Sequence, residues 1–156
     1  MIPALDTQAG ISIRLRQRFN ASRDRVFKAW TDPDVLKHWW CPDGWAPTEI
    51  AVDLRVGGAY RIGMVRQAGG VPVYVDGVFL DVRIPERLVY TWQWKNAFPH
   101  TPETCVTVQF FDRDGATDVL LAHENLPEIA LCLRHWRGWI AAWARIHSAI
   151  EEGTGQ

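Results

Sequence analysis

Two side chains have the residue types and positions to move protons, His123 and Tyr90. His123 is in phase with Val119 and Leu121 on an alternating apolar segment, so we expect it to point into the protein. An imidazole there could hydrogen-bond a ligand or act as a general acid or base. Tyr90 shares its phase with Trp92 and could add a phenol to the same site. Two alternatives stay open: a core histidine with its hydrogen bonds made inside the protein, and a buried tyrosine bonded to backbone.

Metal, phosphate and disulfide chemistry have little support in the sequence. His38 and Cys41 form a single H-x-x-C pair, whereas a structural zinc site needs four ligands. The glycine pairs at 57–58 and 69–70 lack the lysine or the following helix of a phosphate-binding loop. We therefore predict no metal and no cofactor. We expect His147 to be structural, and the odd number of widely spaced cysteines predicts reduced thiols.

Nine tryptophans in 156 residues are the strongest compositional signal. Each would bury roughly 150 to 250 Å² in a core or an interface. Together they either fill the interior or wall a pocket for a small apolar molecule. The residues whose phase predicts such a pocket are Trp39, Met64, Val78, Tyr90, Trp92, Phe110, His123, Trp136, Ile140 and Trp143.

The apolar pattern predicts seven strands and two short helices. The first strand runs from Ile11 to about Asn20, and the others lie near 50–55, 60–64, 73–84, 88–94, 106–110 and 119–123. Ser22 is expected to cap a short helix, because its hydroxyl can accept a hydrogen bond from a free N–H group. Asp32-Pro33 is expected to start a second helix, since proline tolerates the first helical position.

From Pro127 the apolar spacing changes to three and four residues, which predicts one long helix reaching Glu152. Its predicted inward residues are Ile129, Leu133, Trp136, Ile140, Trp143, His147 and Ile150. Strands in a run with helices at the ends indicate a single α+β domain over 11–152, with tails at 1–10 and 153–156.

This layout predicts a pocket on geometric grounds. A helix is only about 10 to 12 Å across, so one helix cannot cover a flat sheet of seven strands. The antiparallel sheet must therefore curve around the long helix. The space at its mouth is then filled by large side chains, by the short helices or by a ligand.

Charge and hydropathy exclude other classes of partner. A formal net charge of -1 provides no field that would attract nucleic acid or anionic lipid. Apolar runs stay short of the roughly 18 residues that a membrane span needs, and the first residues lack the pattern of a signal peptide. We predict a cytoplasmic protein with a small hydrophobic molecule as its partner.

Several segments together resemble a known family. They are Arg25–Trp40 (RVFKAWTDPDVLKHWW), Asp53–Tyr60 (DLRVGGAY), Pro85–Trp92 (PERLVYTW), His123–Pro127 (HENLP) and His135–Trp139 (HWRGW). The chain is similar over these segments to the homologues of the activator of heat-shock protein ATPase, in the START-like (SRPBCC, birch-pollen-allergen-like) superfamily. The resemblance implies a helix-grip fold, with a cavity between the sheet and the last helix.

The resemblance leaves the function open, because this superfamily includes lipid carriers, hormone receptors, polyketide cyclases and co-chaperones. Our leading hypothesis is non-catalytic binding of a small hydrophobic or aromatic ligand. A second is a cyclase or aromatase that uses His123 and Tyr90. A third is a protein-interaction module, linked to a chaperone, in which exposed tryptophans such as Trp45 or Trp94 form a docking patch. Separately, a homodimer and a chaperone are considered as further partners. The larger co-chaperones also use an N-terminal domain, for which we expect no room before Ile11.

Overall fold

Eight antiparallel strands form one sheet in the computed structural model, which describes residues 4–6, 10–99 and 101–152. In the described part the order across the sheet is β1-β2-β8-β7-β6-β5-β4-β3, so β3 to β8 form a meander and β2 pairs with β8. The strands are β1 (Ala4–Asp6), β2 (Gly10–Phe19), β3 (Trp45–Val52), β4 (Ala59–Arg66), β5 (Val73–Arg83), β6 (Arg87–Lys95), β7 (Thr104–Arg113) and β8 (Ala116–Leu126).

The seven predicted strands are confirmed, and β1 is an addition. It pairs with the start of β2, inside the segment predicted as an N-terminal tail. Residues 1–3 and 7–9 of that tail, and the predicted C-terminal tail 153–156, lie outside the described residues.

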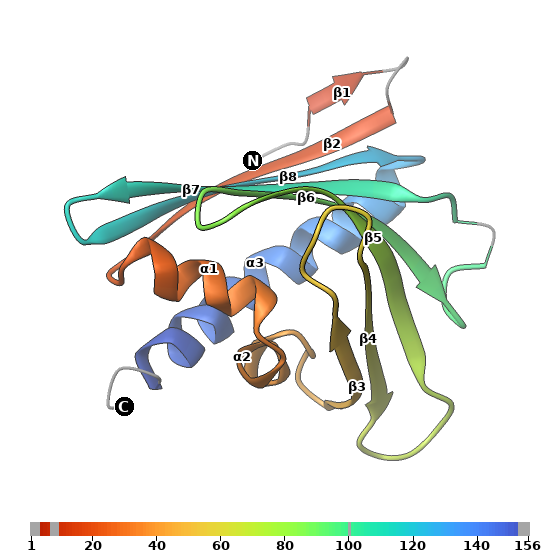
Figure 1. Ribbon diagram of the computed structural model, residues 1–156. Helices are drawn as coiled ribbons and strands as arrows, with labels where there is room; N and C mark the ends of the chain where they lie inside the picture. Colours follow the sequence, from red (N-terminus) through yellow and green to blue (C-terminus); the bar gives the residue numbers. More distant parts are fainter. Residues whose placement is uncertain (1–3, 7–9, 100, 153–156) are drawn as a thin grey trace.

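Two short helices follow β2, as the capping residues predict. Helix α1 (Arg23–Thr31) has Ser22 as its N-cap, and the Ser22 hydroxyl accepts from the Arg25 N–H at 3.4 Å. Helix α2 (Pro33–Trp39) starts with proline, and the Asp32 carboxylate accepts from the Asp34 N–H at 2.9 Å. These helices lie beside α3 (Ile129–Glu152), on the side of the sheet that α3 covers (Figure 1).

The sheet bends around α3, as the helix-grip expectation requires. Figure 1 shows β2, β8 and β7 running along α3, while β5, β4 and β3 turn down beside α2. Register shifts accompany the bend in the β2–β8, β3–β4 and β5–β6 pairs. Although α3 has 24 residues, the described helices include none that is both long and apolar enough to span a membrane.

The buried face of α3 is displaced by about one residue from the predicted stripe. Among the predicted residues, Trp143 and Ile150 are buried, but Ile129 and Ile140 are exposed. The residues of α3 that are buried are Leu131, Cys132, His135, Trp139, Ala142, Trp143, Ile146, Ala149 and Ile150. This shift brings His135 and Trp139 to the sheet side of the helix.

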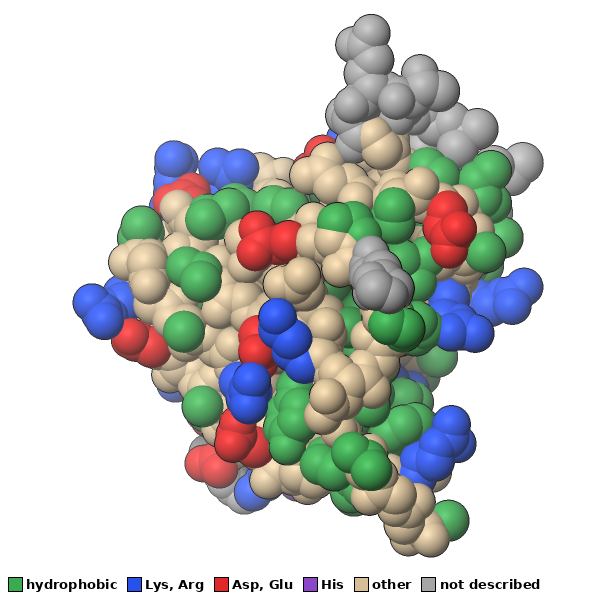
Figure 2. Space-filling model, turned by 90° about the vertical axis from the view of Figure 1, so that its right-hand side faces the viewer, with side chains coloured by type: hydrophobic (Ala, Val, Ile, Leu, Met, Phe, Trp, Pro, Cys, Tyr) green, Lys and Arg blue, Asp and Glu red, His purple; other side chains and the backbone are tan. Residues whose placement is uncertain are grey.

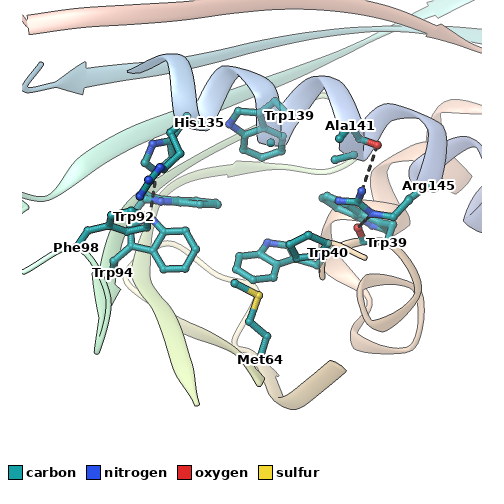
Figure 3. Close-up of a pocket in the computed structure, with 14 residues that line it drawn as sticks. Trp39, Trp40, Met64, Trp92, Trp94, Phe98, His135, Trp139, Ala141 and Arg145 are labelled. Carbon is teal, nitrogen blue, oxygen red and sulfur yellow. Dashed lines mark hydrogen bonds between the residues drawn. The ribbon is translucent and has the colours of Figure 1, made fainter. Parts of the chain in front are cut away.

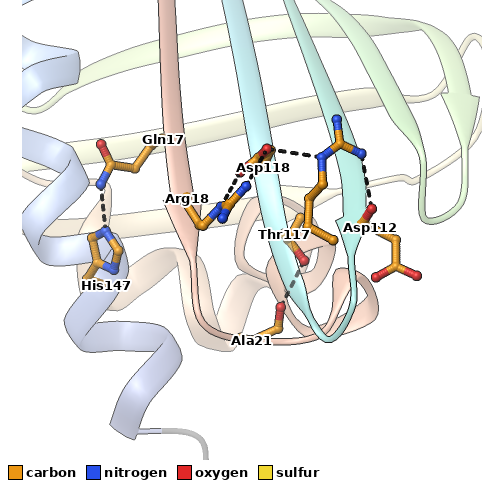
Figure 4. A network of polar contacts seen from close by, with 8 residues as sticks. Gln17, Arg18, Ala21, Asp112, Thr117, Asp118 and His147 are labelled. Carbon is orange, nitrogen blue, oxygen red and sulfur yellow. Dashed lines mark hydrogen bonds and ion pairs between the residues drawn. The ribbon is translucent and has the colours of Figure 1, made fainter.

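Polar contacts at the end of the sheet near α1 join β2, β8 and the β7–β8 turn (Figure 4). Arg18 donates to both carboxylate oxygens of Asp118, at 2.7 and 3.1 Å, and Arg113 approaches the same carboxylate at 3.2 Å. The Arg18 hydrogen bonds hold the pKa of Asp118 below its ordinary value. On α3, His147 bonds Gln17 at 3.0 Å, in keeping with its predicted structural role.

Candidate functional site

A pocket of about 160 Å³ lies between α3, strands β4 and β6, and the connection from α2 to β3 (Figure 3). Aromatic and small apolar side chains make up most of its wall, and polar groups contribute little. The wall consists of Trp39, Trp40, Pro42, Met64, Trp92, Trp94, Phe98, Arg134, His135, Gly138, Trp139, Ala141, Ala142 and Arg145.

The indole walls are held in place by hydrogen bonds and ring contacts. The Trp39 indole N–H donates to the Ala29 carbonyl at 2.7 Å, and the Trp94 indole N–H donates to Nε2 of His135 at 2.9 Å. The ring of Trp40 lies 5.8 Å from Trp92 and 6.2 Å from Trp94, measured between centroids. Because these walls are already ordered, a ligand would not need to organise them.

Helix α3 contributes its smallest residues to the pocket. Gly138, Ala141 and Ala142 share one face by their spacing of three and four residues. A Cβ atom built on Gly138 would have no atom within 4 Å, so the space beside this glycine is open. A glycine inside a helix costs about 0.8–1 kcal/mol relative to alanine. The glycine thus destabilises the helix slightly and leaves space in the pocket wall at this position.

His123 lies behind the pocket wall and is fully buried. Its Nδ1 accepts from the Trp139 indole N–H at 3.2 Å. Its Nε2 bonds Thr104 Oγ1 at 2.8 Å, and that hydroxyl donates to the Trp92 carbonyl, so Nε2 must carry the proton. Burial, and then His135, hold the pKa of His123 well below the ordinary 6.5. The alternative of a core histidine with its bonds made inside the protein therefore describes this residue.

His135 is also neutral and has both ring nitrogens bonded. Nδ1 donates to the Leu131 carbonyl at 2.9 Å, which leaves Nε2 to accept from Trp94. Burial lowers the pKa of His135, although the bond to Leu131 acts in the opposite direction. The two imidazole centroids are 5.1 Å apart, so a proton on either ring would disfavour a proton on the other.

Tyr90 does not meet His123. Tyr90 pairs with Val106, and Val106 pairs with His123, which places the two residues two strands apart, roughly 10 Å. The Tyr90 ring instead packs against Tyr60 and Phe79, at 5.4 and 6.1 Å between centroids. Burial raises its pKa. The predicted proton-transfer pair is thus not assembled in this structure.

The remaining predicted residues fall into three groups. Trp39, Met64 and Trp92 are in the pocket wall, while Phe110 and Trp143 pack against Trp30 in the core. Trp136 is half-buried against the core, and its indole N–H is buried with no hydrogen-bond partner among the described residues.

Val78 and Ile140 are corrections, because their side chains are 39% and 44% exposed. On β5 the inward positions alternate from Val75 through Gly77 to Phe79, so Val78 points away from the core. On α3 the one-residue shift of the buried face turns Ile140 outward.

Sequence reasoning missed most of the α3 side of the pocket, and also Trp40 and Phe98. Trp139 and His135 were available in the motif at 135–139 that supports the family resemblance, but the helix phase pointed to Trp136 and Ile140 instead. Trp94, expected as an exposed docking residue, lines the pocket. Trp45, expected in the same role, is half-buried beneath the guanidinium of Arg66, which lies 4.7 Å from the ring centroid.

A wider hollow of about 500 Å³ adjoins the pocket and shares Pro42, Met64, Trp94 and Phe98 with it. It lies at the end of the molecule where the β4–β5 hairpin and the β6–β7 connection meet. Figure 2 looks onto this end and shows hydrophobic side chains gathered among scattered charges. A ligand larger than the inner pocket could extend into this hollow.

The described residues contain no group of three or more His, Cys, Asp or Glu side chains that could hold a metal ion. The cysteines at 41, 105 and 132 are free thiols. Burial raises the pKa of the Cys41 thiol to about 11, so it stays protonated at neutral pH. The site therefore offers apolar walls, the neutral imidazole of His135 and the guanidinium groups of Arg134 and Arg145, with the neutral imidazole of His123 behind the wall.

Comparisons with known proteins agree with this architecture. A protein of Chromobacterium violaceum has 25% identity and a TM-score of 0.77 over 88% of this chain and 95% of its own. The AHSA1 protein of Silicibacter pomeroyi has 24% identity and a TM-score of 0.79, over 91% of this chain and 99% of its own. A protein of Arthrobacter aurescens has 21% identity and a TM-score of 0.82, over 96% of this chain and 91% of its own.

Curated proteins gave no match. The model of one family does match, over residues 20–151, and its description is "Activator of Hsp90 ATPase homolog 1-like protein". That match includes α1, α2, the six strands β3 to β8 and nearly all of α3, so it spans every wall of the pocket. The chain belongs to the AHSA1 family of activator of Hsp90 ATPase homolog 1-like proteins.

Proposed function

We propose that this protein binds a small aromatic or apolar molecule in the pocket beneath α3 and does not transform it chemically. The observation that carries the proposal is the unfilled space among the rings of Trp39, Trp40, Trp92, Trp94 and Trp139. An apolar cavity of about 150 Å³ is large enough to take benzene or xenon. The pocket therefore suits a one-ring or two-ring ligand, with the adjoining hollow available for substituents.

The histidine geometry favours binding over catalysis. A general acid or base needs a free lone pair or proton directed at the substrate. Both nitrogens of His123 and of His135 are engaged inside the protein. A cyclase-like role would also require His123 and Tyr90 to act on one substrate, although the strand that carries Val106 lies between them. A chaperone-linked role, suggested by the family's description, stays a prediction that a pull-down with Hsp90 would test.

The binding proposal is tested by filling the pocket from α3. Toluene, indole and naphthalene would be titrated while the indole N–H signals are followed by NMR. We expect saturable shifts in the wild type and their loss in Gly138→Phe, which places a phenyl ring in the open space beside this residue. Ile140→Phe adds the same ring at an exposed position two residues away, and it should bind like the wild type.

Two results would contradict the proposal. One is the lack of a saturable response to all three probes in the folded wild-type protein. The other is unchanged binding in Gly138→Phe, since the probes would then occupy some other place. A far-UV circular dichroism spectrum of each variant establishes that the comparison concerns folded proteins.

A further inference from the structure

Arg145 supplies the half-buried cation of the pocket wall. Its Nε–H donates to the Trp39 carbonyl at 2.9 Å, and Nη1 donates to the Ala141 carbonyl at 3.3 Å (Figure 3). These two bonds hold the guanidinium at the end of the pocket beside the indoles of Trp39 and Trp40. A guanidinium carries five N–H groups, so three remain without an acceptor among the described residues.

Arg145 also lacks a carboxylate partner, in contrast to several arginines of the sheet. Arg18 and Arg61 each make a two-pronged ion pair, with Asp118 and Asp76 respectively. No carboxylate in the described part of the chain lies within 4 Å of Arg145, and Asp43 acts on it only at longer range. Burial lowers the pKa of Arg145, while Asp43 and Cys41 act in the opposite direction.

We propose that the pocket is specific for small aromatic carboxylic acids, with the ring among the indoles and the carboxylate on Arg145. This inference rests on the binding function proposed above. A carboxylate fits because a planar guanidinium can bind both of its oxygens at once. A single cation with Asp43 in its neighbourhood suits a monoanion better than a doubly charged phosphate.

Arg137 provides a matched control on the same helix, because it is exposed and does not line the pocket. The other arginine of the pocket wall, Arg134, is also exposed, and its guanidinium lies 5.0 Å from the centroid of the Phe98 ring. Eleven residues of helix separate Arg134 from Arg145, a distance of about 16 Å along the axis. The two guanidinium groups are therefore placed at opposite ends of the pocket, and only Arg145 is fixed by two backbone carbonyls.

The test compares 2-naphthoate with neutral 2-naphthamide by isothermal titration calorimetry. The wild type should bind the acid about tenfold more tightly, as expected for one charge-assisted contact that is partly open to water. Arg145→Met should remove this preference while the amide still binds. Arg137→Met makes the same change in charge outside the pocket wall and should keep the preference.

Each outcome bears on one of the two proposals. Equal affinity of the wild type for acid and amide would overturn the assignment of Arg145 while leaving the pocket intact, and binding of neither compound would overturn the proposed function itself. Loss of the preference in Arg137→Met as well would overturn the assignment, because it would mean that the general positive charge of α3, and not a contact with Arg145, attracts the acid. Because Arg145 also bonds the last residue of α2, Arg145→Lys is the milder variant. It keeps the charge without the planar fork, and its preference should lie between those of the wild type and Arg145→Met.

Discussion

His123 makes the stability of the protein depend on pH. Its pKa in the folded protein lies well below 6.5, its ordinary value, so the unfolded chain takes up the proton first as the pH falls. The stability associated with the neutral ring is complete above pH 6.5 and is lost below it. We expect His123 alone to lower the free energy of unfolding by about 1 kcal/mol between pH 6.5 and 5.5. Urea unfolding at each pH measures this loss.

His123→Gln isolates that contribution, because an amide can still accept from Trp139 and donate to Thr104. The variant should be less stable at pH 7.5, yet lose about 1 kcal/mol less than the wild type between pH 6.5 and 5.5. From pH 7.5 to 8.5 the free energy of unfolding should change by the same amount in the variant and in the wild type. Equal losses on acidification would mean that His123 has the same pKa in the folded and the unfolded protein.

The sequence placed Tyr90 and His123 on the correct face but not at the correct distance. An alternating pattern tells which side of a strand a residue occupies. The distance between two such residues depends on strand order and register, which three separate strands settle here through Val106. Local spacing does not contain that pairing, so the alternating pattern could not tell that Tyr90 and His123 are two strands apart.

Within α3, Gly138 should be a site where a small side chain stabilises the helix. Alanine favours the helix by about 0.8–1 kcal/mol over glycine, and its methyl group would meet no atom within 4 Å. We therefore expect Gly138→Ala to raise the melting temperature by about 2–4 °C. Differential scanning calorimetry measures the change, and naphthalene titration of the same variant should show that binding is retained. A lower melting temperature would mean that the helix needs glycine at this position for packing.

The limits and types of the elements were predictable, whereas the phase of α3 was not. Ser22 and Asp32-Pro33 mark helix starts through local hydrogen bonding, which a short segment contains in full. Helix α3 has large apolar residues on neighbouring faces, with Trp136 and Ile140 on one and Trp139 and Ile146 on the other, and Trp143 lies between them. Periodicity of 3.6 residues cannot choose between stripes one residue apart. The stripe with Trp139 is the buried one, because the sheet packs against it.

At the scale of the molecule, the curvature argument predicted a hollow but not how much of it would stay empty. Both interpretations of the tryptophans hold for different residues. Trp30 and Trp143 fill the interior between α1, β2 and α3, whereas Trp40, Trp92 and Trp94 wall the pocket. The packing of α1 and α2 beside one end of α3 decides which indoles fill the interior. This packing depends on the complete fold and not on local sequence.

Because helices α2 and α3 and strands β4 and β6 all contribute to the pocket, a bound ligand should stabilise the whole domain. A ligand that binds only the folded protein adds about 2.7 kcal/mol when its free concentration is 100 times the dissociation constant. For a chain of this length that corresponds to a rise in melting temperature of about 5–11 °C. Thermal unfolding with and without naphthalene should show this rise in the wild type and in Ile140→Phe. Gly138→Phe should show none, because its own ring occupies the space; an equal rise in that variant would place the ligand outside the pocket.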